Sequence, residues 1–255
     1  MHYWQLIMNS FDARFIDCVP RIPDRPEPGN YVVVDVMHFS TTVVELFSNG
    51  ADRLHVVPDR PDALAYRETN PEALAGGAKT DAFTPVEEYD FYNSPSYVQG
   101  LDVSGRPVSM SSTNGAQAVL SLTESGVEDV DVYIGSTTNA AALGRLLRED
   151  NRPTYLVGAG SKGEPATEDH VGAVLVGRYL NDQPLAEAEL ETYRELLGLR
   201  AVEKYSENPH PIRRRDVEYA RSLNSRTAIP RLVGDHFVDV GDATGLTERP
   251  LATAA

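Results

Sequence analysis

The clearest pattern in the chain is a series of short apolar, β-branched runs, each of which ends at a polar or glycine-containing turn. Runs of this length and composition are typical of buried strands. The run Tyr-Val-Val-Val before Asp35 is the most regular, and another run leads into the turn-forming pair Asn114-Gly115. The sequence therefore predicts five buried strands, at residues 31–35, 53–57, 108–112, 130–134 and 154–157.

Between these runs lie segments in which apolar residues recur at the 3.6-residue spacing of a helix. The predicted helices cover residues 41–48, 115–125, 139–149, 169–180, 186–199 and 212–223. Strands that alternate with helices are typical of a parallel sheet with helices packed on its faces. We therefore predict an α/β fold with a mixed or mostly parallel sheet. It would form one domain over residues 1–255, with a division into lobes 1–125 and 126–255 left open.

Acidic residues dominate the charge of the protein. The 38 Asp and Glu residues against 23 Lys and Arg give a net charge of −15, and only three of the bases are lysines. Such a surface repels phosphate backbones and anionic headgroups, which argues against nucleic-acid and membrane partners. Two explanations remain: an ordinary, mildly acidic enzyme, or adaptation to the high-salt cytoplasm of a halophilic archaeon. Scarce lysine beside abundant arginine favours the second.

The cellular compartment can also be inferred from the sequence. Cys18 is the only cysteine, which excludes an intrachain disulfide and fits a reducing compartment. No apolar run approaches the ~20 residues that a membrane-spanning helix needs. The first ten residues have no basic region before an apolar stretch, as a secretory signal requires. We therefore expect a cytoplasmic protein.

Polar residues gather where the predicted strands end, and ligands of open α/β sheets bind at that edge. Asp35 closes an apolar strand, and a carboxylate there is costly to bury without a cation or hydrogen-bond donors. Ser40, Thr41 and Thr42 then open a helix, where hydroxyls and free N–H groups suit an oxyanion such as phosphate. A helix cap at Ser40 or Thr41, with Asp35 in a turn, explains the same residues equally well.

Two later segments repeat this pattern of polar residues at a strand end. Asn93 and Ser94 form a compact polar turn, which could also be an ordinary loop. Asn114-Gly115 follows a strand and precedes a helix, an arrangement that brings backbone N–H groups close to a ligand. A further polar strand exit ends at Asn139.

Paired acids offer a candidate metal site. Glu168 and Asp169 begin the helix that follows a glycine-bracketed strand exit, and their oxygens would suit a divalent cation. Acids in a first turn also complement the helix dipole without any metal. The sequence contains no phosphate-binding P-loop, HExxH zinc motif, GxSxG nucleophile elbow or CxxC pair. Its six histidines show no metal-ligand spacing, so we expect scattered surface or partly buried imidazoles.

Taken in order, these segments resemble the 2-phosphosulfolactate phosphatase family, which acts in coenzyme M biosynthesis. The similarity runs from about residue 32 to residue 180, and this collinearity favours a shared fold. The similar family motifs are DVLRASTT at residues 35–42, a GGE loop at 76–78, GNSP at 93–95, TTTNGT at 112–116, a GSFLN-like stretch at 135–139, and AG with LED at 159–160 and 168–169.

The resemblance implies a Mg²⁺-dependent phosphatase that cleaves the phosphate ester of a small sulfonated hydroxy acid. In such an enzyme the metal neutralises phosphoryl charge and activates water. By motif position, Asp35, Glu168 and Asp169 would hold Mg²⁺ and serve in catalysis. The residues that the resemblance assigns to the substrate site are His38, Ser40, Thr41, Thr42, Asn93, Ser94, Thr113, Asn114, Gly115 and Asn139.

Two positions depart from the family pattern. The family arginine in DVLRAS is His38 here, followed by the bulky Phe39, and the glutamate expected in the GGE loop is Ala78. An imidazole cannot reproduce the fixed, bidentate phosphate contact of a guanidinium. Three hypotheses follow. The chain is a phosphatase with an altered substrate, a weakened or inactive relative that binds a small anion or assembles with itself, or an unrelated α/β enzyme.

The acid excess leads to a prediction about stability in salt. Repulsion between like charges reaches roughly 30 Å in dilute buffer but only about 3 Å near 1 M salt. Unfolding moves the charges apart, so low salt favours the unfolded chain. We expect the melting temperature to rise markedly between about 0.1 M and 2 M KCl, a salt with weak Hofmeister activity. Equal melting temperatures at the two salt concentrations would contradict salt adaptation and favour the explanation of an ordinary acidic enzyme.

Overall fold

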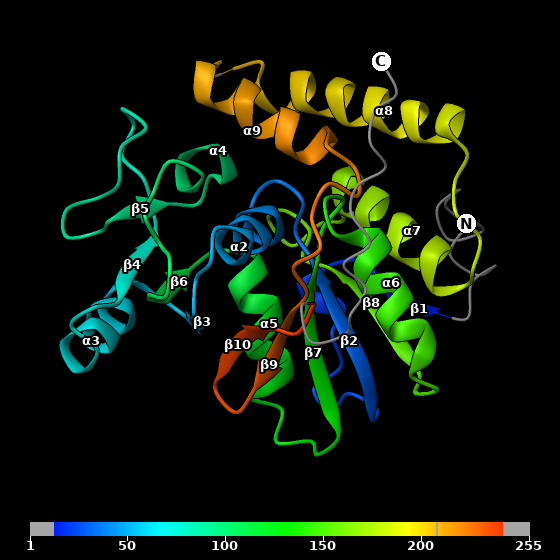
Figure 1. The fold of residues 1–255 in the computed structure, drawn as a ribbon, viewed down its shortest axis with the longest axis horizontal. Coiled ribbons are helices and arrows are strands. Elements are labelled where there is room, and N and C mark those ends of the chain that lie inside the picture. Colours follow the sequence, from blue (N-terminus) through cyan, green and yellow to red (C-terminus); the bar gives the residue numbers. More distant parts are fainter. Residues whose placement is uncertain (1–12, 208, 242–255) are drawn as a thin grey trace.

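Ten strands form one mixed sheet in the computed structural model, which describes residues 13–207 and 209–241 (Figure 1). Four parallel strands make one half, in the order β1 (Ala13–Ile16), β8 (Thr154–Gly158), β2 (Gly29–Val34) and β7 (Val130–Gly135). Four more make the other half, in the order β3 (Arg53–Val57), β6 (Pro107–Ser111), β4 (Leu74–Gly77) and β5 (Phe91–Tyr92). An antiparallel hairpin of β9 (Pro230–Val233) and β10 (His236–Asp239) joins β7 to β3. This sheet confirms the predicted α/β class.

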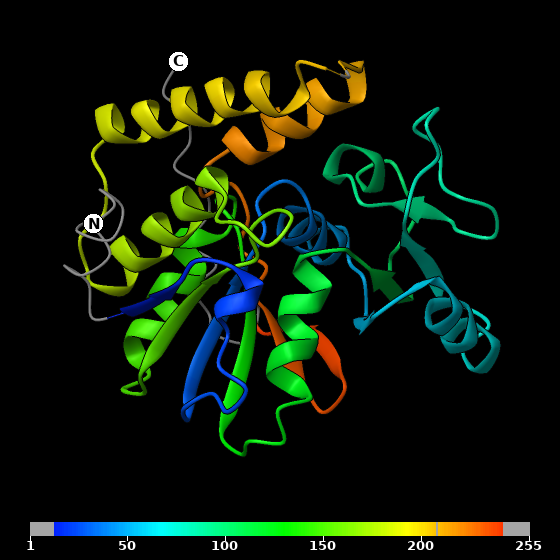
Figure 2. The ribbon, with the colours of Figure 1, turned by 180° about the vertical axis from the view of Figure 1, so that it is seen from behind.

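Helices cover both faces of the first half of the sheet (Figures 1 and 2). One face carries α2 (Phe39–Ser48) and α5 (Gly115–Thr123), and the other carries α6 (Ala140–Glu149) and α7 (Thr167–Leu180). The second half has α3 (Arg60–Thr69) and the short α4 (Pro95–Val98) beside it. Two helices, α8 (Glu187–Tyr205) and α9 (Pro211–Arg221), run side by side above the sheet, and a 3₁₀ turn, η1 (Val19–Arg21), follows β1.

Strand β2 shows why the apolar runs are continuous rather than alternating. Tyr31 and Val33 pack into the core that contains α2 and α5, whereas Val32 and Val34 pack into the core that contains α6 and α7. Because helices bury both faces of a parallel strand, every position along it favours an apolar residue. None of the helices in the described ranges is long and apolar enough to cross a membrane. The segment considered for a secretory signal lies outside the described residues.

The hairpin of β9 and β10 is the seam between the two parallel halves. Each side of the seam is held by a single registered pair, Tyr133 with Arg231 on one side and Leu54 with Phe237 on the other. Phe237 is fully buried and belongs to the same core as α2 and α5. With so few ladder positions, the seam depends on side-chain packing more than on backbone pairing.

This dependence predicts the effect of truncating Phe237. We expect Phe237→Ala to lower the free energy of unfolding by about 3–5 kcal/mol, since it removes a buried ring and leaves a cavity. Val233 lies on the same hairpin but is 55% exposed, so Val233→Ala should change stability by no more than about 0.5 kcal/mol. Urea unfolding of both variants measures the difference, and similar small losses would contradict this account of the seam.

Candidate active site

A cavity of about 510 Å³ lies where the carboxyl ends of β2, β3, β4, β5 and β6 converge. Both halves of the sheet therefore contribute to it, at the edge where ligands of α/β proteins bind. Its lining is polar on most sides and apolar at Met37, Pro58 and Ala78. The residues that line it are Asp35, Met37, His38, Pro58, Gly77, Ala78, Asn93, Ser111, Ser112, Thr113, Asn114 and Gln117.

Asp35 is the carboxylate that faces this cavity, and it is only 6% exposed. The backbone N–H groups of Phe39 and Gly115, the first residues of α2 and α5, donate hydrogen bonds to it. Burial raises the pKa of Asp35 to about 6; Lys204 opposes this rise and Glu168 adds to it. Two helix N-termini thus stabilise a charge that burial disfavours.

Asp169 lies behind Asp35, fully buried at the start of α7. Its Oδ1 accepts a hydrogen bond from Val36 N and its Oδ2 accepts one from Gly160 N, both at 2.9 Å. Burial, with the nearby charges of Asp35 and then Glu168, raises the pKa of Asp169 well above its usual range. Asp35 and Asp169 therefore compete for a proton or share a cation.

Glu168, the third predicted carboxylate, is already paired with two cations of α8. It accepts hydrogen bonds from Lys204 Nζ and, at 3.0 Å, from Arg200 Nε. Burial acts to raise the pKa of Glu168, but Lys204 and Arg200 outweigh it and hold the pKa below the usual value. Lys204 Nζ also donates to the carbonyl of Met37 at 3.2 Å, which fixes α8 against the cavity wall.

The donor set fits a hard divalent cation at Asp35 and Asp169. Oxygen ligands are those that Mg²⁺ prefers, and two neighbouring buried carboxylates favour a compensating positive charge. In the described part of the chain, neither carboxylate forms an ion pair within 4.0 Å. Glu168 fits less well, because both of its oxygens face cationic side chains.

His38 lines the cavity at the position of the family arginine. Its Nε2 lies 2.8 Å from Tyr205 Oη, and the two rings stack with centroids 5.9 Å apart. Burial is the main cause that lowers the pKa of His38 to about 4, so the ring is neutral near pH 7. Its Nδ1 is buried and has no hydrogen-bond partner among the described residues. The site therefore offers one neutral imidazole nitrogen to a ligand.

The hydroxyls of the DVLRASTT-like segment shape the turn after β2. Ser40 Oγ accepts from Asp35 N at 2.8 Å and donates to Val33 O, and Thr41 Oγ1 donates to Val36 O at 2.8 Å. Thr42 is fully buried. None of the three hydroxyl residues is among the described residues that line the cavity. The contacts of Ser40 and Thr41 hold the turn in place rather than reach a ligand, whereas Thr42 Oγ1 is buried without a partner among the described residues.

Some of the other predicted site residues line the cavity, and others support the residues that line it. Asn93, Thr113 and Asn114 line the cavity, and Asn93 Oδ1 is buried without a partner among the described residues. Gly115 gives its N–H to Asp35, and a Cβ there would lie 2.2 Å from the Phe39 ring, so glycine is required. These residues can present polar groups to an anion or support those that do.

Ser94 and Asn139 lie outside the cavity lining. Ser94 Oγ donates to Asp216 Oδ1 at 2.6 Å and caps α4. Asn139 accepts from Ser136 N at 2.8 Å and donates to the carbonyls of Ile134 and Ala228, which links the exit of β7 to the segment before β9. The structure thus does not bring Asn139 to the proposed ligand, because its side chain is used in backbone contacts.

Residues of α8 and α9 were missed by the sequence analysis. The predicted helix ended at residue 199, whereas α8 continues to Tyr205 and places Lys204 and Tyr205 at the site. Asp216 of α9 holds the Ser94 turn. The one available signal was that Lys204 is among only three lysines in a strongly acidic chain.

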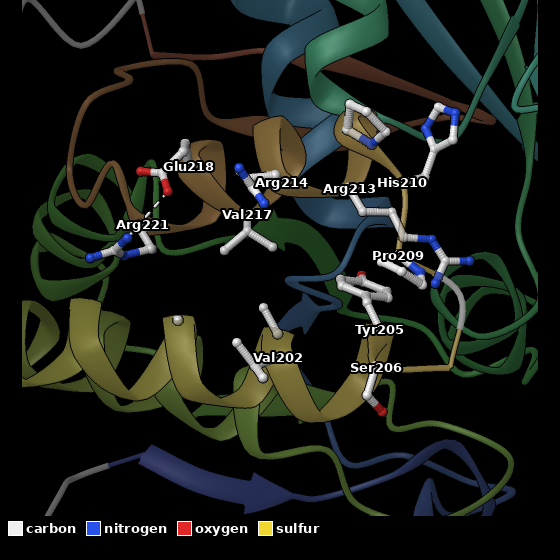
Figure 3. Close-up of a pocket in the computed structure, with 13 residues that line it drawn as sticks. Val202, Tyr205, Ser206, Pro209, His210, Arg213, Arg214, Val217, Glu218 and Arg221 are labelled. Atoms are coloured by element: carbon white, nitrogen blue, oxygen red, sulfur yellow. Dashed lines mark hydrogen bonds and ion pairs between the residues drawn. The ribbon is translucent and has the colours of Figure 1, made fainter.

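A larger cavity of about 640 Å³ lies between α8 and α9 (Figure 3). The guanidinium of Arg213 lies over the rings of Tyr205 and Phe83, 4.6 and 5.0 Å from their centroids. Glu218 is the carboxylate among the described lining residues, and it is paired with Arg221 at 3.2 Å. The buried acids therefore favour the smaller cavity as the catalytic one.

A polar cavity backed by buried carboxylates at the carboxyl edge of the sheet has the form of an α/β enzyme site. The family model described as 2-phosphosulpholactate phosphatase matches residues 18–234, so the chain belongs to that family.

Several relatives carry the name "Probable 2-phosphosulfolactate phosphatase". The protein from Deinococcus radiodurans is 32% identical over 163 residues, which cover 64% of this chain and 66% of the relative. That from Gloeobacter violaceus is 28% identical over 222 residues, 83% of this chain and 92% of the relative. That from Thermus thermophilus is 32% identical over 154 residues, 60% of this chain and 62% of the relative.

The buried ion pair at Glu168 leads to a pH-dependent prediction. Lys204→Met should lower the free energy of unfolding by about 1–3 kcal/mol at pH 7, since one of two partners of a buried charge is lost. The pKa of Glu168 is lower in the folded protein than in the unfolded chain, so the ion pair stabilises the folded state at pH values above the unfolded-state pKa. This stabilisation is lost as pH falls through the folded-state pKa. The loss of unfolding free energy in Lys204→Met, relative to the wild type, should therefore become smaller as pH falls toward 4.

Urea unfolding at both pH values measures this effect. Arg194→Met is a matched control, because Arg194 also lies on α8 but pairs with exposed glutamates. A deficit that stays constant with pH, or that is equally large in the control, would contradict the assignment to Glu168.

Proposed function

We propose that the chain is a Mg²⁺-dependent phosphoric-monoester hydrolase that acts on a small phosphorylated sulfo-hydroxy acid in the 510 Å³ cavity. The observation that carries this proposal is the pair Asp35 and Asp169, two adjacent buried carboxylates with raised pKa values. Family membership and the names of the relatives support the phosphate ester as the substrate class. The proposal also includes a sulfonate group on the substrate, a role in coenzyme M biosynthesis and a host with a high-salt cytoplasm.

The charge balance of the cavity supports the requirement for a cation. Among the described lining residues, none carries a formal positive charge near pH 7, because the His38 ring is neutral. Lys204 lies behind the lining and donates to Glu168 and to the Met37 carbonyl. Bound at Asp35 and Asp169, Mg²⁺ would neutralise phosphoryl charge and lower the pKa of a coordinated water.

The residues of the chain would then orient the ester. Asn93 and Asn114 present amide groups to phosphoryl oxygens, and Thr113 adds a hydroxyl from the turn after β6. His38 offers Nδ1, which donates to an ester oxygen when the ring carries its proton there. Tyr205 fixes the orientation of that ring through its contact with Nε2. Residues from both halves of the sheet would thus position the ester and form hydrogen bonds with it.

A catalytically weakened relative that binds a small anion is the alternative. His38 and Ala78 both line the cavity, so the two departures from the family motifs fall at the site itself. A neutral imidazole supplies one hydrogen bond where a guanidinium supplies two and a charge. Hydrolysis of p-nitrophenyl phosphate with Mg²⁺, at low and at molar salt, separates the two functions: turnover supports the hydrolase, and anion binding without turnover supports the alternative.

Asp35→Asn tests the catalytic role and the cost of burial together. We expect turnover to fall by orders of magnitude, since a metal-binding carboxylate is lost. Without Mg²⁺ at pH 8, the variant should be more stable by roughly 1–3 kcal/mol. The pKa of Asp35 is raised from 3.8 to about 6. The buried carboxylate therefore begins to destabilise the wild-type protein as pH rises between these values, and its full effect is present above pH 6.

Phosphatase assays and chelated thermal melts measure the two effects, with Asp24→Asn as an exposed control. Unchanged turnover in Asp35→Asn would sink the catalytic assignment. Lower stability at pH 8 would show instead that the surrounding N–H groups fully compensate the charge.

A further inference from the structure

Two histidines that are far apart in the sequence meet at the seam. His55 of β3 and His236 of β10 lie beside Asp235, and one ligand atom of each residue lies within 4.8 Å of the others. We propose that this triad is a second metal site, which binds Zn²⁺ or a similar divalent transition metal and clamps the hairpin to β3. The sequence analysis expected scattered imidazoles, because 181 positions along the chain separate His55 from His236.

The contacts within the triad hold its three side chains close together. His236 Nδ1 lies 2.5 Å from Asp235 Oδ1, and His55 Nδ1 lies 3.0 Å from the Asp235 carbonyl oxygen. The two imidazole rings are 5.0 Å apart between centroids. Asp235 is 76% exposed, so its side chain is free to adjust as a metal draws the donors to separations of roughly 3–3.5 Å, as tetrahedral bonds of 2.0–2.2 Å require.

The chemistry of the donors selects the metal. Two imidazoles and one carboxylate are a common ligand set for Zn²⁺, and imidazole nitrogen favours zinc, copper or nickel over magnesium. Three protein ligands leave a coordination position for water. The triad therefore differs in preference from the all-oxygen pair proposed for Mg²⁺.

Neighbouring side chains orient the histidines as outer-shell partners of metal sites do. Tyr66 Oη lies 2.9 Å from His236 Nε2, and in the tautomer whose Nε2–H donates to this oxygen, Nδ1 is free for a metal. The Tyr66 ring also stacks on His55 at 4.8 Å. Arg53 Nε donates to Tyr66 Oη at 3.4 Å, so this guanidinium is directed at the tyrosine oxygen.

The position of the triad gives the site a structural role. His55 follows Leu54, whose pairing with Phe237 is the single registered pair between β3 and β10. None of the three residues is among those described as lining the 510 Å³ cavity. A metal held by both sides of the seam adds a link where backbone pairing is sparse, and a ligand that binds only the folded state stabilises it.

Zinc titration of the whole chain, freed of metal by a chelator, tests the proposal. We expect one Zn²⁺ bound at pH 7.5 with a rise in melting temperature. Asp235→Ala should weaken zinc binding at least about tenfold and His236→Ala should abolish it. Titration with Co²⁺ in place of Zn²⁺ should give visible absorption bands of nitrogen-ligated cobalt, which are lost in the same variants.

Two controls separate this site from its alternatives. Asp35→Asn should keep the zinc site, so loss of zinc binding there would assign the metal to the catalytic carboxylates and overturn the proposal. His210→Ala removes a histidine outside the triad, one that stacks on Phe83, and should bind zinc as the wild type does. Because Asp235 is exposed, its variant should fold even if His236→Ala does not. Unchanged zinc affinity in Asp235→Ala would overturn the proposal.

Discussion

The burial of two adjacent carboxylates, Asp35 and Asp169, is the constraint on which the rest of the site depends. A buried acid needs donors or a cation, and here four backbone N–H groups from three segments of the chain supply the donors. The N-termini of α2 and α5 point at Asp35, while the residue after it and the turn after β8 donate to Asp169. The helices are therefore positioned by charge at one edge as well as by apolar packing along their length.

The same constraint explains why α8 extends over the site. Glu168 adds a third negative charge next to the other two, and Lys204 and Arg200 neutralise it from outside the sheet. The positive charge that the family places on the β2 turn is absent at His38, and Lys204 supplies one from a different element. The imidazole remains neutral because Tyr205 and the surrounding burial leave it little access to water.

The sequence could predict the parts of the fold that have strong local patterns. The predicted strand over residues 53–57 agrees with β3, and the other four predicted strands differ from the observed ones by one or two residues at one or both ends. The hairpin was missed because β9 and β10 have only four residues each, begin with Pro230 and His236 respectively, and lack a continuous apolar run. The short strands β1, β4 and β5 were missed for the same reason of length.

The candidate site was only partly predictable, for a different reason. Residues at strand exits, such as Asp35, Asn93 and Asn114, share an edge because parallel strands end together, and the cavity includes them. Asn139 also follows a strand, but its amide is used to tie backbone segments together, which no local pattern reveals. Lys204 reaches the site from a helix outside the sheet, so only tertiary packing places it there.

The seam also sets an order of assembly during synthesis. Gly135 and Pro230 bound the 94 residues that separate the end of β7 from the start of β9, and the ribosome needs about 5–20 seconds to add that many. Until then β7 and β3 each present an unpaired strand edge, the kind of surface on which nascent chains aggregate. The two halves of the sheet thus become one only after the hairpin has been made, and a cell that makes this protein must protect both edges until the hairpin emerges.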